Sequence, residues 1–390
     1  MPCSSRRGWQ DRPSGDGPWS FRTWSYAQYP LNCDAQAGVA YQFIWAQQAG
    51  DAHVPLLATR LPAVQAAVRR AGSVFAASWA HVIDSAATKL SDHTPRVVTG
   101  RARDGRCQVA FDRVRVPGDV WPREPYESFD NDGDPATPPR QGIFAWLQAQ
   151  GFDRPDRRYV VLEQGPGVWN PGGGVALMAA NGTFAPLDDQ PGPQNRNEAA
   201  GTWIAVNVRE DGSGLDPYAT GNLGEELAHE WAHSLGAVLP TAPHYNALNP
   251  NGGHAADCAD LLCYNDFDAD GQHYAACGGS AVDTFQAFRT DPRDPRWGLD
   301  APQVSRAAYR LDCRRDDYWG VAARTGAEKP WAAQRWSTHH SRWLWGNPDV
   351  YTGPAFDVGA HGVPPQCAYD PGGWCPDGTP NGLAGPRATS

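Results

Sequence analysis

Residues 222–244 constrain the fold of this chain more than any other segment does. They read NLGEELAHEWAHSLGAVLPTAPH. Within them Leu223–Leu235 contains no proline and no run of β-branched residues, so we expect a helix there. Asn222 can cap its start and Glu225 can complete a capping box, while Gly236 stands where a helix commonly ends in a left-handed turn. The rest of the chain is therefore expected to pack around this helix.

Two histidines and a glutamate on this helix predict a zinc site. His229 and His233 are four residues apart, so their side chains project from one face of the helix and can reach one Zn²⁺ at about 2.0–2.1 Å. Glu230 is offset around the helix and can instead take a proton from zinc-bound water as the general base. The alternative is an ordinary helix that carries two histidines without a metal.

A third zinc ligand is needed, because a catalytic zinc site has three protein ligands and leaves the fourth position to water. His244 is the residue that we predict, since the chain can reverse after Gly236 and nearby prolines stiffen its return. The main alternative that the sequence leaves open is His254, followed by Asp257 and Asp260. For His244 itself, the alternative is a loop histidine exposed to solvent.

Other segments are expected to form strands and further helices. The apolar patterns predict strands at residues 39–47, 108–116, 158–163 and 203–208, and helices at 61–90 (interrupted near Gly72) and 142–150. Residues 164–200 are rich in Gly, Pro and Asn and indicate a long surface excursion. After Gly236 the chain is expected to be irregular, with a last helix-like stretch at 329–345.

The nine cysteines indicate an oxidising environment and therefore a secreted protein. The close pairs Cys258/Cys263 and Cys367/Cys375 are expected to form small disulfide loops. Residues 1–38 contain no apolar signal core, so the prediction of secretion assumes that the natural start lies upstream.

The charge and hydropathy of the chain limit the kinds of partner that it is expected to bind. The net charge of -10 argues against a general nucleic-acid binder, which needs basic surface to displace counterions. No stretch approaches the roughly 18 consecutive apolar residues of a membrane helix, so no membrane span is expected. A protein or peptide substrate remains the expected partner, and the oligomeric state is left open.

An acidic run suggests a binding site for a second cation. Asp266, Asp268 and Asp270 form DxDxDG, the opening of a calcium-binding loop. The twelfth position of an EF-hand would be Cys277 instead of a bidentate glutamate, so this is not an EF-hand. A different Ca²⁺ site and a solvated acidic turn are the two alternatives.

The HEWAHSLG motif with a later histidine resembles the metzincin zinc peptidases. It is more closely similar to a group of secreted bacterial peptidases in which the motif HExxHxLGAV is followed by APH and then by a DxMCY turn. The stretches of this chain that match are His229–Val238, Ala242–His244 and Asp260–Tyr264. The resemblance covers roughly residues 39–345. It implies an α+β fold, with a mixed sheet and two main helices in an upper subdomain at 39–236, an irregular disulfide-bonded lower subdomain at 237–345, and a cleft between them. The composition of residues 1–38 and 346–390 indicates tails.

The resemblance also implies a role for one further residue, and the sequence departs from the metzincin pattern at two positions. Tyr264 matches the tyrosine that stabilises the oxyanion in some metzincins. The strict position of the third ligand is Leu239, which cannot bind zinc, and the turn methionine is replaced by Leu262, whose similar volume is expected to be tolerated.

The predicted function is a zinc-dependent endopeptidase. Trp203–Val208 is expected to be the edge strand of the cleft that pairs with an extended substrate. Leu262 keeps a non-catalytic, metal-stabilised binding module as an alternative. The second alternative is a zinc amidase that acts on cell-wall peptides, with the same residues in a different cleft.

Overall fold

The computed structural model describes the elements that surround the HExxH helix. The described residues are 31, 33, 38–52, 55–83, 93–122, 142–165, 174–176, 186–189, 195–209, 211–215, 223–242, 245, 253–255, 261–262, 311–312, 317–319, 336–345 and 347.

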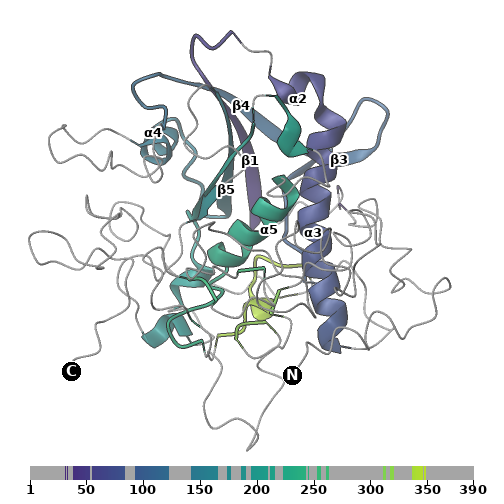
Figure 1. Ribbon diagram of the computed structural model, residues 1–390, viewed down its shortest axis with the longest axis vertical. Coiled ribbons are helices and arrows are strands. Elements are labelled where there is room, and N and C mark those ends of the chain that lie inside the picture. Colours follow the sequence, from purple (N-terminus) through teal and green to yellow (C-terminus); the bar gives the residue numbers. More distant parts are fainter. Residues whose placement is uncertain are drawn as a thin grey trace, which may run out of the picture.

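A five-stranded mixed sheet forms the centre of the fold (Figure 1). Its order is β4 (Phe111–Val116), β1 (Ala40–Gln48), β5 (Arg157–Gln164), β7 (Trp203–Asn207) and β6 (Gly174–Ala176). The first four strands are parallel, and only β6 runs antiparallel, against β7. Strand β6 therefore ends one side of the sheet with a reversed direction.

Helices cover both faces of this sheet. The long helix α3 (Leu61–Ile83) and the HExxH helix α5 (Leu223–Ser234) lie on one face, and α4 (Ile143–Ala149) lies on the other (Figure 1). The remaining elements are α2 (Leu56–Thr59), the hairpin of β2 (Thr99–Arg101) and β3 (Cys107–Val109), and the 3-10 turns η2 (Pro186–Asp189), η3 (Arg196–Glu198), η4 (Ser213–Leu215) and η6 (Thr338–His340).

Alternating side chains of the central strands supply the two cores. In β5, Val160 and Leu162 belong to the cluster beneath α3 and α5, whereas Tyr159 and Val161 belong to the cluster beneath α4. All eight residues of β5 are buried, as expected of a parallel strand with helices on both faces. The α3/α5 cluster extends from Val39 to Leu344, so the described parts of both predicted subdomains share it.

Helix α5 is fixed by aromatic packing on its sheet-facing side. Trp231 is fully buried, with ring centroids 5.7 Å from Tyr41, 6.0 Å from Phe43 and 6.1 Å from Phe75. Such aromatic pairs contribute about 0.5–1.5 kcal/mol each beyond the burial of their area. The helix that carries the two histidines is thereby held against both β1 and α3.

The approach of α5 to α3 depends on a glycine. A Cβ on Gly224 would lie 2.8 Å from Arg70 Cδ and 2.9 Å from the Ala67 carbonyl oxygen. The absent side chain lets the two helices approach closely, and it brings Arg70 into a buried ion pair with Glu225. Gly224, which weakens the helix pattern in the sequence, is therefore required by packing.

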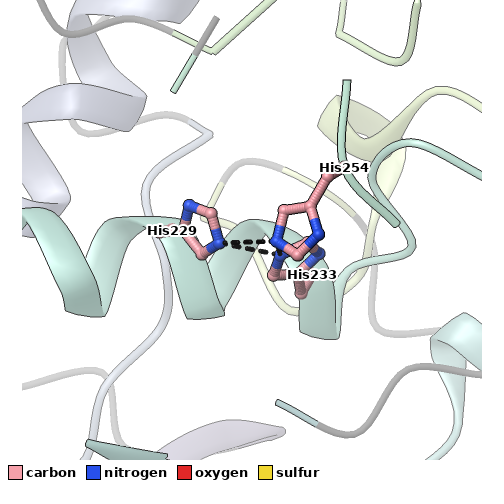
Figure 2. Close-up of side chains that lie close together, drawn as sticks. All are labelled: His229, His233 and His254. Carbon is pink, nitrogen blue, oxygen red and sulfur yellow. Dashed lines mark hydrogen bonds between the residues drawn. The ribbon is translucent and has the colours of Figure 1, made fainter. Parts of the chain in front are cut away.

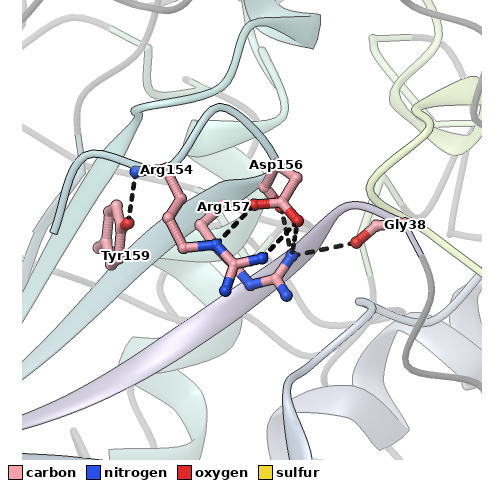
Figure 3. A network of polar contacts seen from close by, with 5 residues as sticks. All are labelled: Gly38, Arg154, Asp156, Arg157 and Tyr159. Carbon is pink, nitrogen blue, oxygen red and sulfur yellow. Dashed lines mark hydrogen bonds and ion pairs between the residues drawn. The ribbon is translucent and has the colours of Figure 1, made fainter.

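A polar network joins the starts of β1 and β5 (Figure 3). The Arg154 guanidinium donates to the Asp156 carboxylate at 2.9 and 3.0 Å, and Arg157 Nη1 donates to the Gly38 carbonyl at 3.0 Å (Figure 3). Arg154 N also donates to the Tyr159 hydroxyl at 2.9 Å. Since the Arg154–Asp156 pair is exposed to solvent, we expect it to stabilise the fold by no more than about 1 kcal/mol.

Several predicted elements are confirmed, and others differ in a way that packing explains. The strands at 39–47, 158–163 and 203–208, the helix at 142–150 and the HExxH helix are observed within one or two residues. Helix α3 is not interrupted near Gly72, because that glycine is buried and its neighbours Ala71 and Val74 pack in the core. The single strand predicted at 108–116 is divided at Ala110 into β3 and β4, which belong to different sheets.

Two further predictions for irregular segments were wrong. Residues 164–200 are not only a surface excursion, since they contain the sheet strand β6 and the buried segment 195–200. Residues 336–345, the described part of the predicted last helix, contain only the short turn η6. This segment reaches α5, where the Trp336 indole N–H donates to the Leu235 carbonyl at 2.8 Å.

A disulfide joins Cys33 to Cys107, with a Cα–Cα distance of 5.7 Å. It connects the segment before β1 to the start of β3, a pairing that the spacing of the cysteines did not reveal. The predicted pairs Cys258/Cys263 and Cys367/Cys375 lie outside the described residues. None of the helices in the described ranges is long and apolar enough to cross a bilayer.

Candidate metal centre

The end of helix α5 is set by Gly236, as the sequence predicts. Its φ of 79° is in the left-handed region that favours glycine. A side chain at this position would also collide with the Asn197 amide, which donates to the Asp188 carbonyl at 2.9 Å. The chain therefore turns sharply just after His233 and packs closely on the segment of η3.

Three histidines meet at α5. The distances between their Nε2 atoms are 2.9 Å for His229 and His233, 3.2 Å for His229 and His254, and 3.1 Å for His233 and His254. Figure 2 shows the first two imidazoles on the helix and the third, from a separate segment, turned toward them. Within the described residues this is the one group of three ligand side chains close enough to share an ion.

The spacing of these nitrogens fits a tetrahedral metal ion. Nitrogens bound to zinc at about 2.0–2.1 Å in tetrahedral directions are roughly 3.3 Å apart. The observed separations of 2.9–3.2 Å are close to that value. His229 Nδ1 lies 3.0 Å from the Leu261 carbonyl oxygen, which can only accept, so the proton is on Nδ1 and Nε2 presents its lone pair.

Burial keeps the three imidazoles neutral, which is the form that binds a metal. All three side chains are buried. Burial lowers the pKa of His229 to about 4, although the bond to the Leu261 carbonyl acts in the opposite direction. Burial, followed by the neighbouring imidazoles, holds the pKa of His233 and of His254 well below the usual value. Protons therefore compete little with a cation for these nitrogens at neutral pH.

Acid is expected to destabilise the metal-free protein. The unfolded imidazole has a pKa of about 6.5, whereas the pKa of folded His229 is about 4. Between these two pKa values the unfolded state binds more protons than the folded state. The free energy of unfolding therefore has its full value above pH about 6.5 and decreases as the pH drops toward about 4. For His229 the loss is at most about 3 kcal/mol. Urea unfolding across this pH range measures it.

The variant His229→Asn is the control for this pH series. Its unfolding free energy is expected to fall less steeply with acid, because one titrating group is gone while others such as His339, whose pKa burial lowers to about 3, remain. Equal slopes in the two proteins would contradict a buried neutral imidazole at position 229.

A turn formed by Leu261 and Leu262 organises the site through its main chain. The Leu261 carbonyl accepts from His229, and the Leu262 carbonyl accepts from the Ala255 amide at 2.8 Å. Ala255 follows His254 directly and forms an antiparallel bridge with Tyr245. One turn thus orients two of the three imidazoles, and the side chain of Leu262 is fully buried.

Glu230 is buried on α5 beside the histidines. Burial raises the pKa of its carboxyl well above the usual value, and the neighbouring carboxylate of Glu226 raises it further. A cation held by the imidazoles would act in the opposite direction and favour the ionised form. Glu226, which the sequence places on the same face as His229, is itself buried.

The structure brings together only some of the predicted site residues. His229, His233 and Glu230 lie together on α5, and the third imidazole among the described residues is His254, the alternative to His244. The other predicted residues, His244, Tyr264 and the calcium candidates Asp266, Asp268 and Asp270, lie outside the described residues.

Strand β7 is not the edge strand that we predicted. It lies between β5 and β6, and all five of its residues are buried, so its main chain is already paired on both sides. The edge beside α5 is formed by β6, which sequence reasoning missed. In comparisons with protein-family models, curated proteins and solved structures, none matched this chain.

Proposed function

We propose that this chain is a zinc-dependent endopeptidase in which His229, His233 and His254 hold the metal and Glu230 is the general base. The observation that carries the proposal is the convergence of three buried Nε2 atoms within 3.2 Å of one another on an HExxH helix. His254 takes the place that the sequence had suggested for His244. The orientation of His229 by the Leu261 carbonyl supports the same conclusion.

The roles of the side chains follow from their chemistry. A zinc ion at this site supplies a Lewis acid and makes water acidic enough to attack a carbonyl at neutral pH. Glu230 accepts the proton of the attacking water and later donates it to the leaving amine. Tyr264, two residues beyond the buried Leu262, is the proposed donor to the oxyanion.

The position of β6 at the end of the described sheet supports a peptide as the substrate. Strand β6 pairs with β7 on one side and ends the sheet on the other, within the described strands. An extended peptide can add to such an edge through main-chain hydrogen bonds, largely independently of its sequence. Because β6 lies against α5, a peptide bound along it would pass close to Glu230.

Secretion and calcium binding remain proposals beside the main one. The disulfide between Cys33 and Cys107 supports an oxidising environment. A Ca²⁺ ion at Asp266, Asp268 and Asp270 would be tested by calcium titration of the purified protein, with unfolding temperature as the readout. A shift in that temperature that Asp268→Asn abolishes would support the site.

Metal analysis combined with casein hydrolysis tests the proposed function. The purified protein is expected to contain close to one zinc per chain and to cleave casein. A chelator should stop cleavage, and added zinc should restore it, because the histidines are the only anchor proposed for the metal. Absence of bound zinc would contradict the proposal outright.

Two other outcomes of this experiment would support a different function. Bound zinc without cleavage of any peptide would favour the non-catalytic binding module that the replacement of methionine by Leu262 suggested. Cleavage confined to peptidoglycan stem peptides would favour the zinc amidase. A substrate panel that contains casein, a mixture of peptides and purified peptidoglycan separates the three.

A further inference from the structure

Strand β6 passes Glu230 at a distance that only glycine permits. A Cβ on Gly174 would lie 2.8 Å from Glu230 Cγ, 3.0 Å from Glu230 Oε1 and 3.0 Å from the Ala205 carbonyl oxygen. These separations are at or below the shortest contacts that real Cβ atoms make, so a side chain could be accommodated only if its neighbours moved. The Ala205 carbonyl belongs to the adjacent strand β7 and cannot move alone.

The backbone conformation does not require glycine at this position. Gly174 is the first residue of an extended strand and is not among the described glycines with a positive φ. Val175 packs in the cluster beneath α4, and Ala176 packs in the cluster beneath α3 and α5. Positions 174 and 176 therefore face α5, and both carry minimal side chains. The requirement for glycine is one of space beside Glu230.

We propose that Gly174 is a positioning residue for the carboxylate of Glu230, an inference that rests on the proposed role of Glu230 as base. Strand β6 forms a wall against Glu230 Cγ, so it limits the rotamers that the side chain can adopt. The wall holds the carboxylate in one place relative to the three imidazoles. The main chain of β6 then lies directly beside the base.

The variant Gly174→Ala tests this inference. A displacement of the base by about 1 Å is expected to lower kcat on a fluorogenic peptide by roughly a hundredfold. The zinc content should stay at the wild-type level, because the atoms nearest to the added methyl group belong to Glu230 and Ala205 and not to the three histidines. KM should change little, because the pairing edge of β6 keeps its main-chain groups.

Gly224→Ala is the matched control. It adds the same methyl group in an equally crowded place, 2.8 Å from Arg70 Cδ, but between α5 and α3 and not beside Glu230. It is expected to lower the free energy of unfolding without lowering kcat of the folded protein. Equal losses of kcat in the two variants would overturn the inference, because general crowding of α5 would then explain both.

A double variant shows whether Gly174 acts through Glu230. In the Glu230→Asp background the side chain at position 230 is one methylene shorter. Gly174→Ala is therefore expected to lower kcat by a much smaller factor there than in the wild type. An equal loss in both backgrounds would overturn the inference. So would a Gly174→Ala protein with wild-type kcat.

Cobalt substitution gives a readout that does not need turnover. The visible spectrum of the cobalt-loaded protein changes with pH as water near the metal ionises, and the midpoint depends on where the Glu230 carboxylate lies. Gly174→Ala should shift this midpoint and Gly224→Ala should not; an unshifted midpoint overturns the inference. If the wild type binds metal but cleaves nothing, the proposed function fails while this measurement still decides on Gly174.

Discussion

The variant His254→Ala is expected to lose zinc, whereas His244→Ala is expected to keep it. Removing His254 leaves two imidazoles on α5, and two protein ligands do not make a tetrahedral catalytic site. Loss of a partner outside the ligand shell already lowers metal affinity by about 10–100-fold. Loss of a direct ligand should exceed that range. Competition with a chromogenic chelator measures the affinity of each variant.

The control for this experiment is His340→Ala. His340 is an exposed histidine of η6, so its removal takes away one imidazole without touching the three that converge. It is expected to bind zinc as tightly as the wild type. Retention of zinc by His254→Ala together with its loss in His244→Ala would restore the ligand that the sequence suggested.

The position of α5 could be predicted because its signals are local. The absence of proline, the apolar residues at helical spacing and the terminal Gly236 all lie within the segment that they define. The predicted helix Leu223–Leu235 and the observed helix Leu223–Ser234 differ by one residue. The same local rules place His229, Glu230 and His233 correctly relative to one another.

The sequence could not decide between His244 and His254 as the third imidazole, because the position of His254 depends on contacts between distant residues. His254 is held by the bridge from Ala255 to Tyr245 and by the bond from Ala255 to the Leu262 carbonyl. Neither contact leaves a pattern in the sequence. The choice of His244 relied on the stiffness of the chain after Gly236, which limits how the chain can return but does not determine which histidine arrives.

The edge of the sheet was assigned to the wrong strand for a related reason. The alternation of Trp203–Val208 predicts an edge strand, yet all residues of β7 are buried between the two helical layers. Strand β6 has only three residues and lies among glycines and prolines, so its pairing with β7 is what makes it a strand. Tertiary pairing, and not propensity, decides such a short element.

A leucine at position 262, where the resemblance would place a methionine, is compatible with what the turn does. The contacts that orient the histidines come from the carbonyl groups of Leu261 and Leu262 and not from their side chains. Any residue of suitable volume that leaves this turn intact keeps those contacts. Leu262 is therefore weak evidence for a degenerate enzyme.

The variant Glu230→Gln is expected to lower kcat by roughly 10²–10⁴-fold, the usual contribution of a general base. Glutamine keeps the size of the side chain and its contact with Gly174, but it cannot accept the proton of the attacking water. Zinc content should stay near one per chain, since Glu230 is not among the three converging ligands. Turnover of a fluorogenic peptide and metal analysis of the same sample measure both quantities.

Glu226→Gln is the matched control, because it removes one buried carboxylate from the same helix. The Glu226 charge raises the pKa of Glu230, so its removal should lower that pKa and move the acidic limb of the pH–rate profile to lower pH. The plateau of kcat should change far less than in Glu230→Gln. Activity retained by Glu230→Gln would remove Glu230 as the base, and loss of zinc from that variant would show instead that position 230 supports the metal site.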